Sequence, residues 1–581
     1  MVAGAFPGLG PDADDPVFQS SGRRTARPSG SKDTDMMRGI LDIDALNVRF
    51  TGRNSHFDAL RGVSLSLEQG RILGVVGESG SGKSVTGLSV MGLLPQQASI
   101  TGGRIRFRDQ DITARTPRHL RGASIAMVFQ NPHAALNPTR RICDQLSDVI
   151  QAHESLDRGA IRQRVIHLLE SVNFPDVSRR MGVYPHELSG GLCQRVMIAM
   201  AIACSPSVII ADEPTTGLDV LTQKAVMDLL FRLSRERAMS MMLITHDLGL
   251  AAQYCDSIAV MQKGTVVESG SPANIFSNPQ HAYTQRLIEA CTTMHPAQPH
   301  PAGKTTSRKR RPLLEVSNLR KRYANGHLAV DDVSFTIAPG ESLGLIGESG
   351  SGKSTLSRLV GRLLDPDDGA ISFEGRSIGT IGAHDFFRAE QRPHIQLVFQ
   401  DAAGSLNPRF TAFDSIADPV RRLGPARDPG ALRHHVEKCA ADVGLAPALL
   451  DRYPHQLSGG QCARVGIARA ISVDPKLLIL DEPTAALDVL AQSEILALLE
   501  RLRREKGMSY LFVSHDLHIV RMICDRMVIL QNGKIVETGN CEEVFQNPRA
   551  PYTAQLLAAI PHFRPASQEA AAATGTEFAG S

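Results

Sequence analysis

The glycine-rich run Gly77-Glu78-Ser79-Gly80-Ser81-Gly82-Lys83-Ser84 occurs twice in this chain, because it returns as Gly347-Glu348-Ser349-Gly350-Ser351-Gly352-Lys353-Ser354. Each copy follows a short apolar run, at 72–76 and 343–346, and precedes residues that can form a helix. A strand, a glycine loop and a helix N-terminus in this order make a nest of backbone N–H groups for phosphate, with the lysine reaching the β- and γ-phosphates. Both runs are therefore interpreted as phosphate loops. The residues expected to contact nucleotide are Gly77, Ser79, Gly80, Gly82, Lys83 and Ser84 in the first copy and Gly347, Ser349, Gly350, Gly352, Lys353 and Ser354 in the second.

The duplication extends well beyond these loops. Lys83 and Lys353 lie 270 positions apart, whereas Glu213 and Glu482 lie 269 apart. One single-residue deletion therefore separates the two copies over this stretch, which indicates an internal repeat. Further matched pairs are Gln130 with Gln400, Ser189 with Ser458 and His246 with His515.

Bulk composition limits the class of protein. The 581 residues exceed what one hydrophobic core organises and suit two domains of about 250 residues. A net charge of +3 gives no electrostatic case for nucleic acid as the partner. Nine cysteines without a CxxC pair indicate neither a zinc site nor a disulfide framework and favour a reducing cytosol. No apolar run reaches the roughly 18 residues needed to span a bilayer.

Two acidic pairs follow buried, strand-like runs. The sequences are Val208-Ile209-Ile210-Ala211-Asp212-Glu213 and Leu477-Leu478-Ile479-Leu480-Asp481-Glu482. After a phosphate loop, the first acid of such a pair assists Mg²⁺ and the second polarises an attacking water as a general base. Asp212 and Asp481 are therefore metal candidates, together with the loop serines, and Glu213 and Glu482 are catalytic candidates.

A Leu-Ser-Gly-Gly run precedes a helical pattern in each half, expected over 194–203 and 463–471. Such a helix start can bind an anion, and it can also be a simple N-cap. The candidate residues are Ser189, Gly190 and Gly191 in the first half and Ser458, Gly459 and Gly460 in the second.

This set of motifs resembles the ATP-binding-cassette ATPases over roughly 500 residues. The resemblance implies an α/β fold with two tandem nucleotide-binding domains, each a phosphate-loop core with a helical subdomain, paired head to tail. The expected division is a disordered extension at 1–38, a first cassette at 39–292, a linker at 293–312, a second cassette at 313–562 and a disordered tail at 563–581. The basic run at 308–311 is interpreted as solvated linker, with contact to anionic lipid as the alternative.

The resemblance also implies roles for particular residues. Each ATP would be clamped between one phosphate loop and the Leu-Ser-Gly-Gly of the other half, with Mg²⁺ bound in both sites. Because the reactive residues occur in both halves, two competent sites are expected. Leu192 stands where the family commonly has glutamine, as at Gln461, and this could weaken the site built on Lys353. The remaining implied residues are Gln130 and Gln400 (metal and catalysis), His246 and His515 (γ-phosphate switch), Phe50 and Tyr323 (adenine), and Asp219 and Asp488 (the loop that crosses between the halves).

The two halves have matched endings that are similar to those of oligopeptide, dipeptide and nickel importers. They are Ile275-Phe276-Ser277-Asn278-Pro279 through Tyr283-Thr284 and Val544-Phe545-Gln546-Asn547-Pro548 through Tyr552-Thr553. This resemblance implies two integral-membrane permeases and an extracytoplasmic solute-binding protein as partners, and a peripheral location at the cytoplasmic face of the inner membrane. About sixty helical residues after each Gln loop would receive a permease helix. No cysteine follows Cys541, so no iron–sulfur cluster is expected. A soluble tandem cassette acting on ribosomes or DNA, and an exporter ATPase, are the alternatives, while the cargo stays open among peptides, glutathione, nickel and opines.

Overall fold

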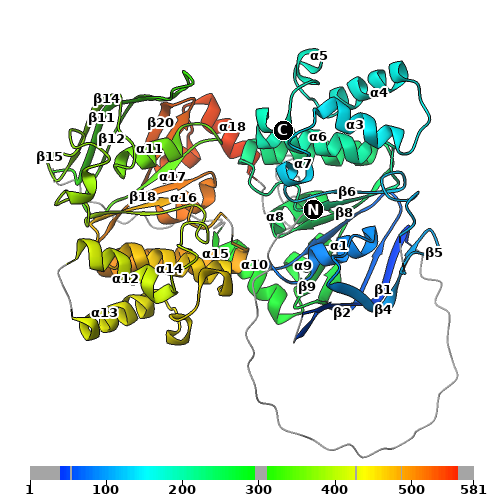
Figure 1. Ribbon diagram of the computed structural model, residues 1–581, viewed down its shortest axis with the longest axis horizontal. Helices are drawn as coiled ribbons and strands as arrows, with labels where there is room; N and C mark the ends of the chain where they lie inside the picture. Colours follow the sequence, from blue (N-terminus) through cyan, green and yellow to red (C-terminus); the bar gives the residue numbers. More distant parts are fainter. Residues whose placement is uncertain are drawn as a thin grey trace, which may run out of the picture.

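The computed structural model describes residues 39–52, 55–114, 116–294, 311–424, 428–485 and 487–560. Two halves of the same architecture lie side by side (Figure 1). The predictions for the extension at 1–38, for most of the linker with its basic run, and for the tail at 563–581 fall outside the described residues. Nothing tests the proposed domain bounds, and we retain them as a proposal.

A six-stranded sheet forms the centre of each half. Five strands are parallel and one edge strand is antiparallel. The central strands are buried along their length, because helices cover one face of the sheet and a smaller sheet with one helix covers the other. In spatial order the first sheet contains β10 (Thr265–Gly270), β9 (Ser257–Gln262), β3 (Ile72–Val76), β8 (Ser240–Thr245), β7 (Val208–Asp212) and β6 (Ile125–Val128). The second sheet contains β16 (Ile395–Val398), β17 (Leu477–Asp481), β18 (Ser509–Ser514), β13 (Ser342–Ile346), β19 (Arg526–Gln531) and β20 (Lys534–Asn540).

A smaller antiparallel sheet accompanies each central sheet. Its inner face and one face of the central sheet enclose a separate apolar core in each half. The first contains, in order, β2 (His56–Leu67), β1 (Leu41–Thr51), β4 (Ala98–Phe107) and β5 (Gln110–Asp111). The second contains β12 (Leu328–Ile337), β11 (Leu314–Arg322), β14 (Asp368–Phe373) and β15 (Arg376–Ser377).

Helices pack around the central sheets. Those of the first core are α1 (Lys83–Met91), α6 (Gly190–Ile202), α7 (Val220–Glu236), α8 (Leu248–Tyr254), α9 (Pro272–Ser277) and α10 (Ala282–Met294). Those of the second are α11 (Lys353–Val360), α14 (Gly459–Ile471), α15 (Val489–Lys506), α16 (Leu517–Ile523), α17 (Cys541–Gln546) and α18 (Pro551–Ala559).

The helical insert after each Gln loop is present, as the sequence predicts. The first contains α2 (Pro132–Ala135), α3 (Ile142–Gln151), α4 (Arg158–Ser171), α5 (Val177–Arg180) and the 3-10 turn η1 (Pro185–Glu187). The second contains α12 (Ala412–Leu423), α13 (Pro429–Asp442) and the 3-10 turns η3 (Pro447–Leu449) and η4 (Pro454–Gln456), while η2 (Phe386–Arg388) precedes its Gln loop.

The two halves contact each other through their last helices. Helix α10 of the first half packs on α15 and α16 of the second, and α18 of the second packs on α7 of the first (Figure 1). One large cluster of buried apolar side chains includes Leu287 of α10 and Leu556 of α18 together with core residues of both halves. The halves are therefore joined by a shared apolar core, and the predicted fold class of two paired cassettes is confirmed.

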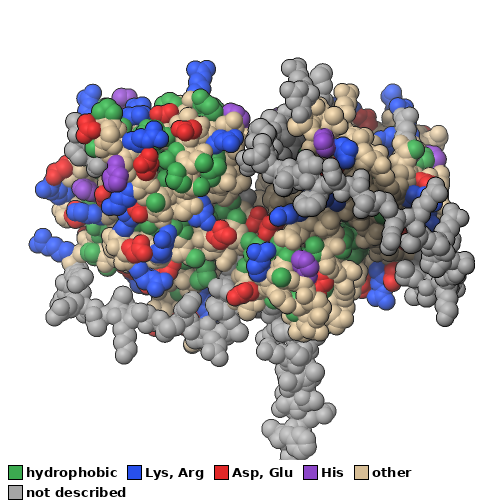
Figure 2. All heavy atoms as spheres, turned by 90° about the horizontal axis from the view of Figure 1, so that it is seen from below, with side chains coloured by type: hydrophobic (Ala, Val, Ile, Leu, Met, Phe, Trp, Pro, Cys, Tyr) green, Lys and Arg blue, Asp and Glu red, His purple; other side chains and the backbone are tan. Residues whose placement is uncertain are grey.

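The surface is mixed in charge. With 63 basic and 60 acidic side chains, the chain has positive and negative groups interspersed over the face drawn in Figure 2, instead of one basic patch. Among the described residues, no helix is both long enough and apolar enough to cross a bilayer.

Candidate active site

Each phosphate loop leads from a central strand into a helix that begins at its lysine. Gly82 and Gly352 precede these helices with φ of 103° and 106°, a conformation that favours glycine. The ammonium group of Lys83 donates to the carbonyl oxygens of Gly77, at 2.7 Å, and Glu78, at 2.8 Å. Lys353 makes the same two contacts at the same distances. Burial lowers the pKa of both lysines.

Beside the first loop, a glutamate collects three polar partners. Glu213 accepts hydrogen bonds from the Gln130 amide at 2.8 Å and the Thr216 hydroxyl at 2.9 Å, and its other oxygen lies 3.4 Å from Nδ1 of His246. Burial alone would raise the pKa of Glu213, but His246 and Thr216, with the charge of Lys83, hold it at about 2. The carboxylate is therefore ionised at neutral pH and able to orient a water molecule.

The second half repeats two of these three contacts, because Ala485 stands at the position that matches Thr216. The Gln400 amide donates to Glu482 at 2.8 Å, and Nδ1 of His515 lies 3.3 Å from the other carboxylate oxygen. Burial opposes the shift, but His515 lowers the pKa of Glu482 as well. The sequence-predicted glutamine, glutamate and histidine are thus brought together in both halves.

The aspartate before each glutamate faces the serine of the phosphate loop. The Ser84 hydroxyl donates to Asp212 at 2.9 Å, whereas Ser354 and Asp481 are 3.5 Å apart. In the second half Ser357 also donates to Asp481, at 3.3 Å. Burial, reinforced by the charge of the adjacent glutamate, raises the pKa of Asp212 to about 6 and raises that of Asp481.

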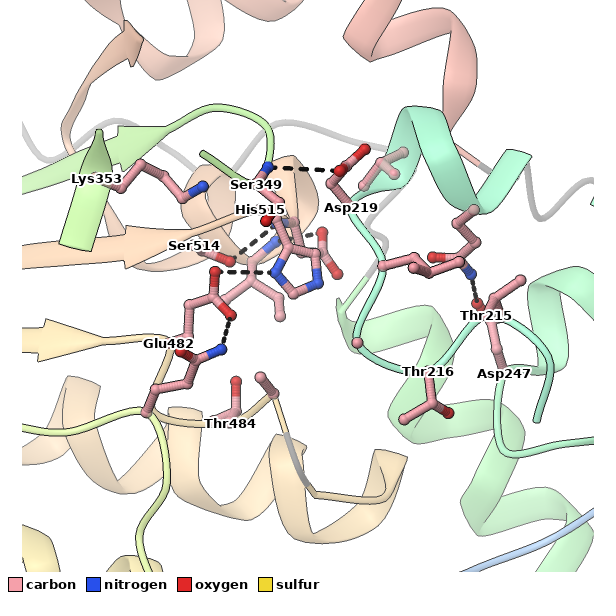
Figure 3. Close-up of a pocket in the computed structure, with 18 of the residues that line it drawn as sticks. Thr215, Thr216, Asp219, Asp247, Ser349, Lys353, Glu482, Thr484, Ser514 and His515 are labelled. Atoms are coloured by element: carbon pink, nitrogen blue, oxygen red, sulfur yellow. Dashed lines mark hydrogen bonds and ion pairs between the residues drawn. The ribbon is translucent and has the colours of Figure 1, made fainter. Parts of the chain in front are cut away.

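A cavity of about 430 Å³ lies between the halves at the second phosphate loop. Figure 3 shows Lys353, Glu482 and His515 on one side and Asp219 from the first half on the other. The carboxylate of Asp219 accepts a hydrogen bond from the backbone N–H of Ser349 at 3.4 Å. The loop that contains Asp219 therefore crosses between the halves, as the resemblance implies. The matching residue Asp488 lies close enough to Lys83 and Glu78 to perturb the pKa values of both.

The Leu-Ser-Gly-Gly residues do not line this cavity. Ser189 and Ser458 are instead N-caps of α6 and α14, so both helices begin at the glycines, earlier than expected. The Ser458 hydroxyl accepts from the N–H of Gln461 at 3.3 Å, and the Gln461 amide oxygen accepts from the N–H of Ser458 at 2.9 Å. With Leu192 at the matching position, Ser189 has no side-chain cap bond. Clamping of ATP by this motif in the opposite half stays a prediction.

Of the expected adenine-contacting aromatic residues, Phe50 lies in β1 and Tyr323 directly follows β11. Tyr323 lines the cavity, and its hydroxyl is 3.1 Å from that of Thr355. Phe50 is half-buried and packs against the first small core. Opposite Phe50 in the β1–β2 ladder is Phe57, 45% exposed, just as His327 lies opposite Tyr323 and lines the cavity. Sequence reasoning missed Phe57, although its offset of 270 from His327 was available as a signal.

Two tyrosines of the matched endings also reach the phosphate loops. The backbone N–H of Glu78 donates to the Tyr283 hydroxyl at 3.0 Å, and that of Glu348 donates to Tyr552 at 3.1 Å. Sequence reasoning noted both residues only as family markers. Their recurrence 269 positions apart, 205 and 204 residues after the loop glutamates that they contact, was the available signal for a role at the site.

Comparison with known proteins agrees with this geometry. The ABC transporter family matches residues 60–216 and 330–485. The chain belongs to the ABC transporter family. This ABC ATPase also matches the oligopeptide/dipeptide transporter C-terminal region twice, at residues 267–317 and 536–579.

Curated relatives cover almost the whole ABC chain. It is 40% identical over 569 residues to the glutathione import ATP-binding protein GsiA of Shigella dysenteriae serotype 1, covering 91% of this chain and 90% of that protein. The same values hold for GsiA of Escherichia coli K12. The chain is also similar to a solved dimeric structure of the ATP-binding cassette MJ0796 in a post-hydrolysis state bound to ADP and Pi. The sequence identity is 29% and the TM-score is 0.37, and the match covers 39% of this chain and 98% of that one. The family matches and the GsiA relatives together show that the chain is an ATP-binding, ATP-hydrolysing member of the oligopeptide/dipeptide/glutathione-type importer family.

Proposed function

We propose that this chain is the ATPase subunit that energises import of peptides or related small solutes through separate permeases. A solute-binding protein on the outer side would deliver the cargo, and the ATPase would lie at the cytoplasmic face of the inner membrane. The observation that carries the proposal is the oligopeptide/dipeptide C-terminal region, matched once in each half next to a complete set of reactive residues. Glutathione import, for which these relatives are named, supports the same class of cargo.

In this proposal the two halves carry two ATP sites. Each loop lysine would bind the β- and γ-phosphates, and Glu213 and Glu482 would polarise the attacking water. His246 and His515 would hold these carboxylates ionised and in place, as their 3.4 and 3.3 Å contacts support. The Leu-Ser-Gly-Gly of each half would close on the ATP of the other, which requires the halves to approach further than they do in this structure.

The oxygen donors near each loop fit a magnesium ion. Mg²⁺ prefers oxygen ligands and in nucleotide sites takes few protein ligands, because phosphates supply others. In the first half the Ser84 hydroxyl donates to the Asp212 carboxylate at 2.9 Å, and the Gln130 amide donates to the neighbouring residue Glu213 at 2.8 Å. We propose these three, and Ser354, Asp481 and Gln400 in the second half, as its ligands. The bound ion would neutralise phosphate charge during hydrolysis.

The permease would dock beside the Gln loops. In the second half a groove of about 280 Å³ lies between the core and the helical insert, and three large apolar side chains at its rim, Leu363, Phe387 and Phe399, are 43%, 53% and 38% exposed. In the first half the matching residues Leu93 and Phe129 are 40% and 36% exposed. Exposed apolar side chains next to a loop that contacts the catalytic glutamate suit a partner helix that senses the ATP state.

Uptake of labelled di- and tripeptides by cells that lack this protein would test the proposal. The cells would carry the intact chain, the Glu213→Gln, Glu482→Gln double variant, or Glu390→Gln, which makes the same chemical change in an exposed ion pair. We expect uptake with the intact chain and with Glu390→Gln, and none with the double variant. Equal uptake in all cells, including those without the protein, would rule out these peptides as required cargo. The two single Glu→Gln variants test site equivalence, which loss of turnover in only one of them would refute.

A further inference from the structure

The tyrosines of the two matched endings form hydrogen bonds with the backbone of the phosphate loops. The hydroxyls of Tyr283 and Tyr552 accept the backbone N–H groups of Glu78 and Glu348, at 3.0 and 3.1 Å. Both side chains are buried, being 1% and 6% exposed. Burial raises the pKa of Tyr552 to about 12, so its hydroxyl stays neutral at physiological pH. The same contact in two copies of the sequence indicates a shared role.

Each tyrosine binds the peptide unit that also holds the loop lysine. The Gly77–Glu78 peptide donates its N–H to Tyr283, and its carbonyl oxygen accepts from the Lys83 ammonium at 2.7 Å. The second half repeats the arrangement around Lys353, also at 2.7 Å. Because a peptide unit is planar, fixing the direction of its N–H also fixes that of its carbonyl. The tyrosine hydroxyl therefore sets the position of the oxygen that holds the lysine.

The backbone at this peptide is tightly confined. Gly77 has a φ of +149°, and a Cβ added there would lie 2.2 Å from the carbonyl oxygen of Met261. At Gly347, with a φ of +159°, the matching distance to the Leu530 carbonyl oxygen is 2.4 Å. The neighbouring strand therefore leaves little room at the glycine, and the tyrosine hydroxyl holds the N–H of the peptide that follows it.

The helices that carry the tyrosines are anchored to their own sheets. Glu268 in β10 accepts the backbone N–H groups of Gln280, at 2.8 Å, and His281, at 3.1 Å, just before α10 begins. Glu537 in β20 makes the matching pair of hydrogen bonds, at 2.8 and 3.0 Å, before α18. Burial opposes the shift, but these backbone hydrogen bonds and the hydroxyls of Thr284 and Thr553 lower the pKa values of both glutamates. Each tyrosine is thus held at a defined place relative to its phosphate loop.

The same helices reach the opposite half. Helix α18, which carries Tyr552, packs on α7, and the N-cap of α7 is Asp219. Asp219 accepts the N–H of Ser349, directly after the Glu348 N–H that Tyr552 accepts. Two consecutive N–H groups of one phosphate loop are therefore held by side chains from two elements that pack on each other. The first half makes the matching contact with the second: α10, which carries Tyr283, packs on α15, whose N-cap is Asp488.

We propose that Tyr283 and Tyr552 are positioning residues for ATP hydrolysis, which orient the peptide that holds the loop lysine and tie that orientation to the contact between the halves. The inference rests on the proposed role of Lys83 and Lys353 as phosphate ligands. A movement of α18 against α7, or of α10 against α15, changes where the hydroxyl lies relative to the loop. The matched C-terminal regions then serve the ATP sites directly, in addition to joining the halves.

Removal of single hydroxyl groups tests the positioning role. Tyr283→Phe and Tyr552→Phe in the full chain are compared with Tyr254→Phe and Tyr510→Phe, which also lose one hydrogen bond, to Asp228 at 2.6 Å and to the Leu499 carbonyl at 2.8 Å, away from the loops. The purified chains are assayed for Mg·ATP turnover and thermal unfolding. We expect kcat to fall about fivefold in the first pair, as the loss of one hydrogen bond predicts, with KM within about twofold. Equal kcat values in all four variants would overturn the positioning role.

A double-mutant cycle tests the link between the halves. Tyr552→Phe combined with Asp219→Asn should deviate from the product of the single effects on kcat by about threefold or more, because both act on adjacent N–H groups of one loop. Tyr552→Phe combined with Asp488→Asn, which lies at the other loop, should deviate less. Equal deviations in the two cycles would overturn the link. Lys353→Ala distinguishes failure of the proposed ATP site from failure of this inference. Unchanged turnover in Lys353→Ala would refute the ATP site itself. Lost turnover in Lys353→Ala, together with unchanged turnover in Tyr552→Phe, would refute only the role of the tyrosine.

Discussion

Exchanging the third residue of the signature helices is expected to change turnover at one ATP site for each exchange. In α14, Gln461 and Ser458 form a reciprocal pair of hydrogen bonds at 2.9 and 3.3 Å, whereas α6 has Leu192 and lacks this pair. Gln461→Leu removes the pair from the second half. Leu192→Gln supplies the missing partner in the first half.

The size of the effect follows from the capping interaction. A capping box contributes about 1 kcal/mol to the start of a helix, which corresponds to roughly a fivefold change in the ratio of ordered to frayed helix ends. Leu192 is half-buried against the large apolar cluster, so its replacement loses part of an apolar contact, about 1 kcal/mol. We therefore expect Leu192→Gln to leave the free energy of unfolding almost unchanged. Turnover at the site that its helix closes should rise about two- to fivefold.

The assay uses backgrounds in which one site is silenced. Glu213→Gln leaves the site of Lys353, which the α6 signature would close, and Glu482→Gln leaves the site of Lys83. Leu192→Gln should act only in the first background, and Gln461→Leu should lower turnover about fivefold only in the second. The reverse pattern would show that each signature serves the phosphate loop of its own half, and this would refute the proposed pairing.

Two further predictions concern the adenine side and the acid stability of the first half. Phe57→Ala should weaken the binding of a fluorescent ATP analogue about fivefold, because loss of one stacking contact costs about 1 kcal/mol. Phe50→Ala should mainly lower the thermal unfolding midpoint. Equal affinities in the two variants would argue against stacking of adenine on Phe57. Burial would raise the pKa of Asp256, but a backbone N–H and the guanidinium groups of Arg71 and Arg235 lower it overall. Its contribution to stability is then present above the unfolded pKa of about 3.9 and is lost as pH falls through the lower folded pKa. Urea unfolding from about pH 6 to pH 2 should therefore show a shallower loss for Asp256→Asn than for the parent, and parallel curves would contradict the shift.

The local parts of the site follow from the sequence because local physics determines them. The strand over 72–76 has the predicted bounds, since five apolar residues before a glycine loop have no other place to be buried. The acid pair, the Gln loop and the histidine meet because all follow the carboxyl ends of neighbouring parallel strands. The signature helices were expected to begin later, because glycine is a poor helix former; Ser189 and Ser458 cap these ends, where the first-turn glycines cost little.

Features that depend on packing between the halves could not be predicted in this way. No periodicity in α10 or α18 shows that one face contacts its own core and another contacts the opposite half. The hydrogen bond between Asp219 and Ser349 joins residues 130 positions apart, and no local propensity encodes it. That the Leu-Ser-Gly-Gly residues do not line the cavity is likewise a matter of how the halves pack, which no local pattern indicates.

Three departures from symmetry fall on the site around Lys353. The Ser354 and Asp481 side chains are 3.5 Å apart, compared with 2.9 Å for the matching pair. Asp219 accepts a hydrogen bond from a backbone N–H of this phosphate loop, and the signature helix of the first half has Leu192 in place of a capping glutamine. The reactive side chains are the same in both halves, so these differences alter how much must rearrange before ATP is clamped, and not whether it can be hydrolysed. Two identical cassettes in a homodimer would have to use one sequence for both sites. Fusion removes that restriction, and we therefore expect two competent sites, of which the one around Lys353 closes more slowly.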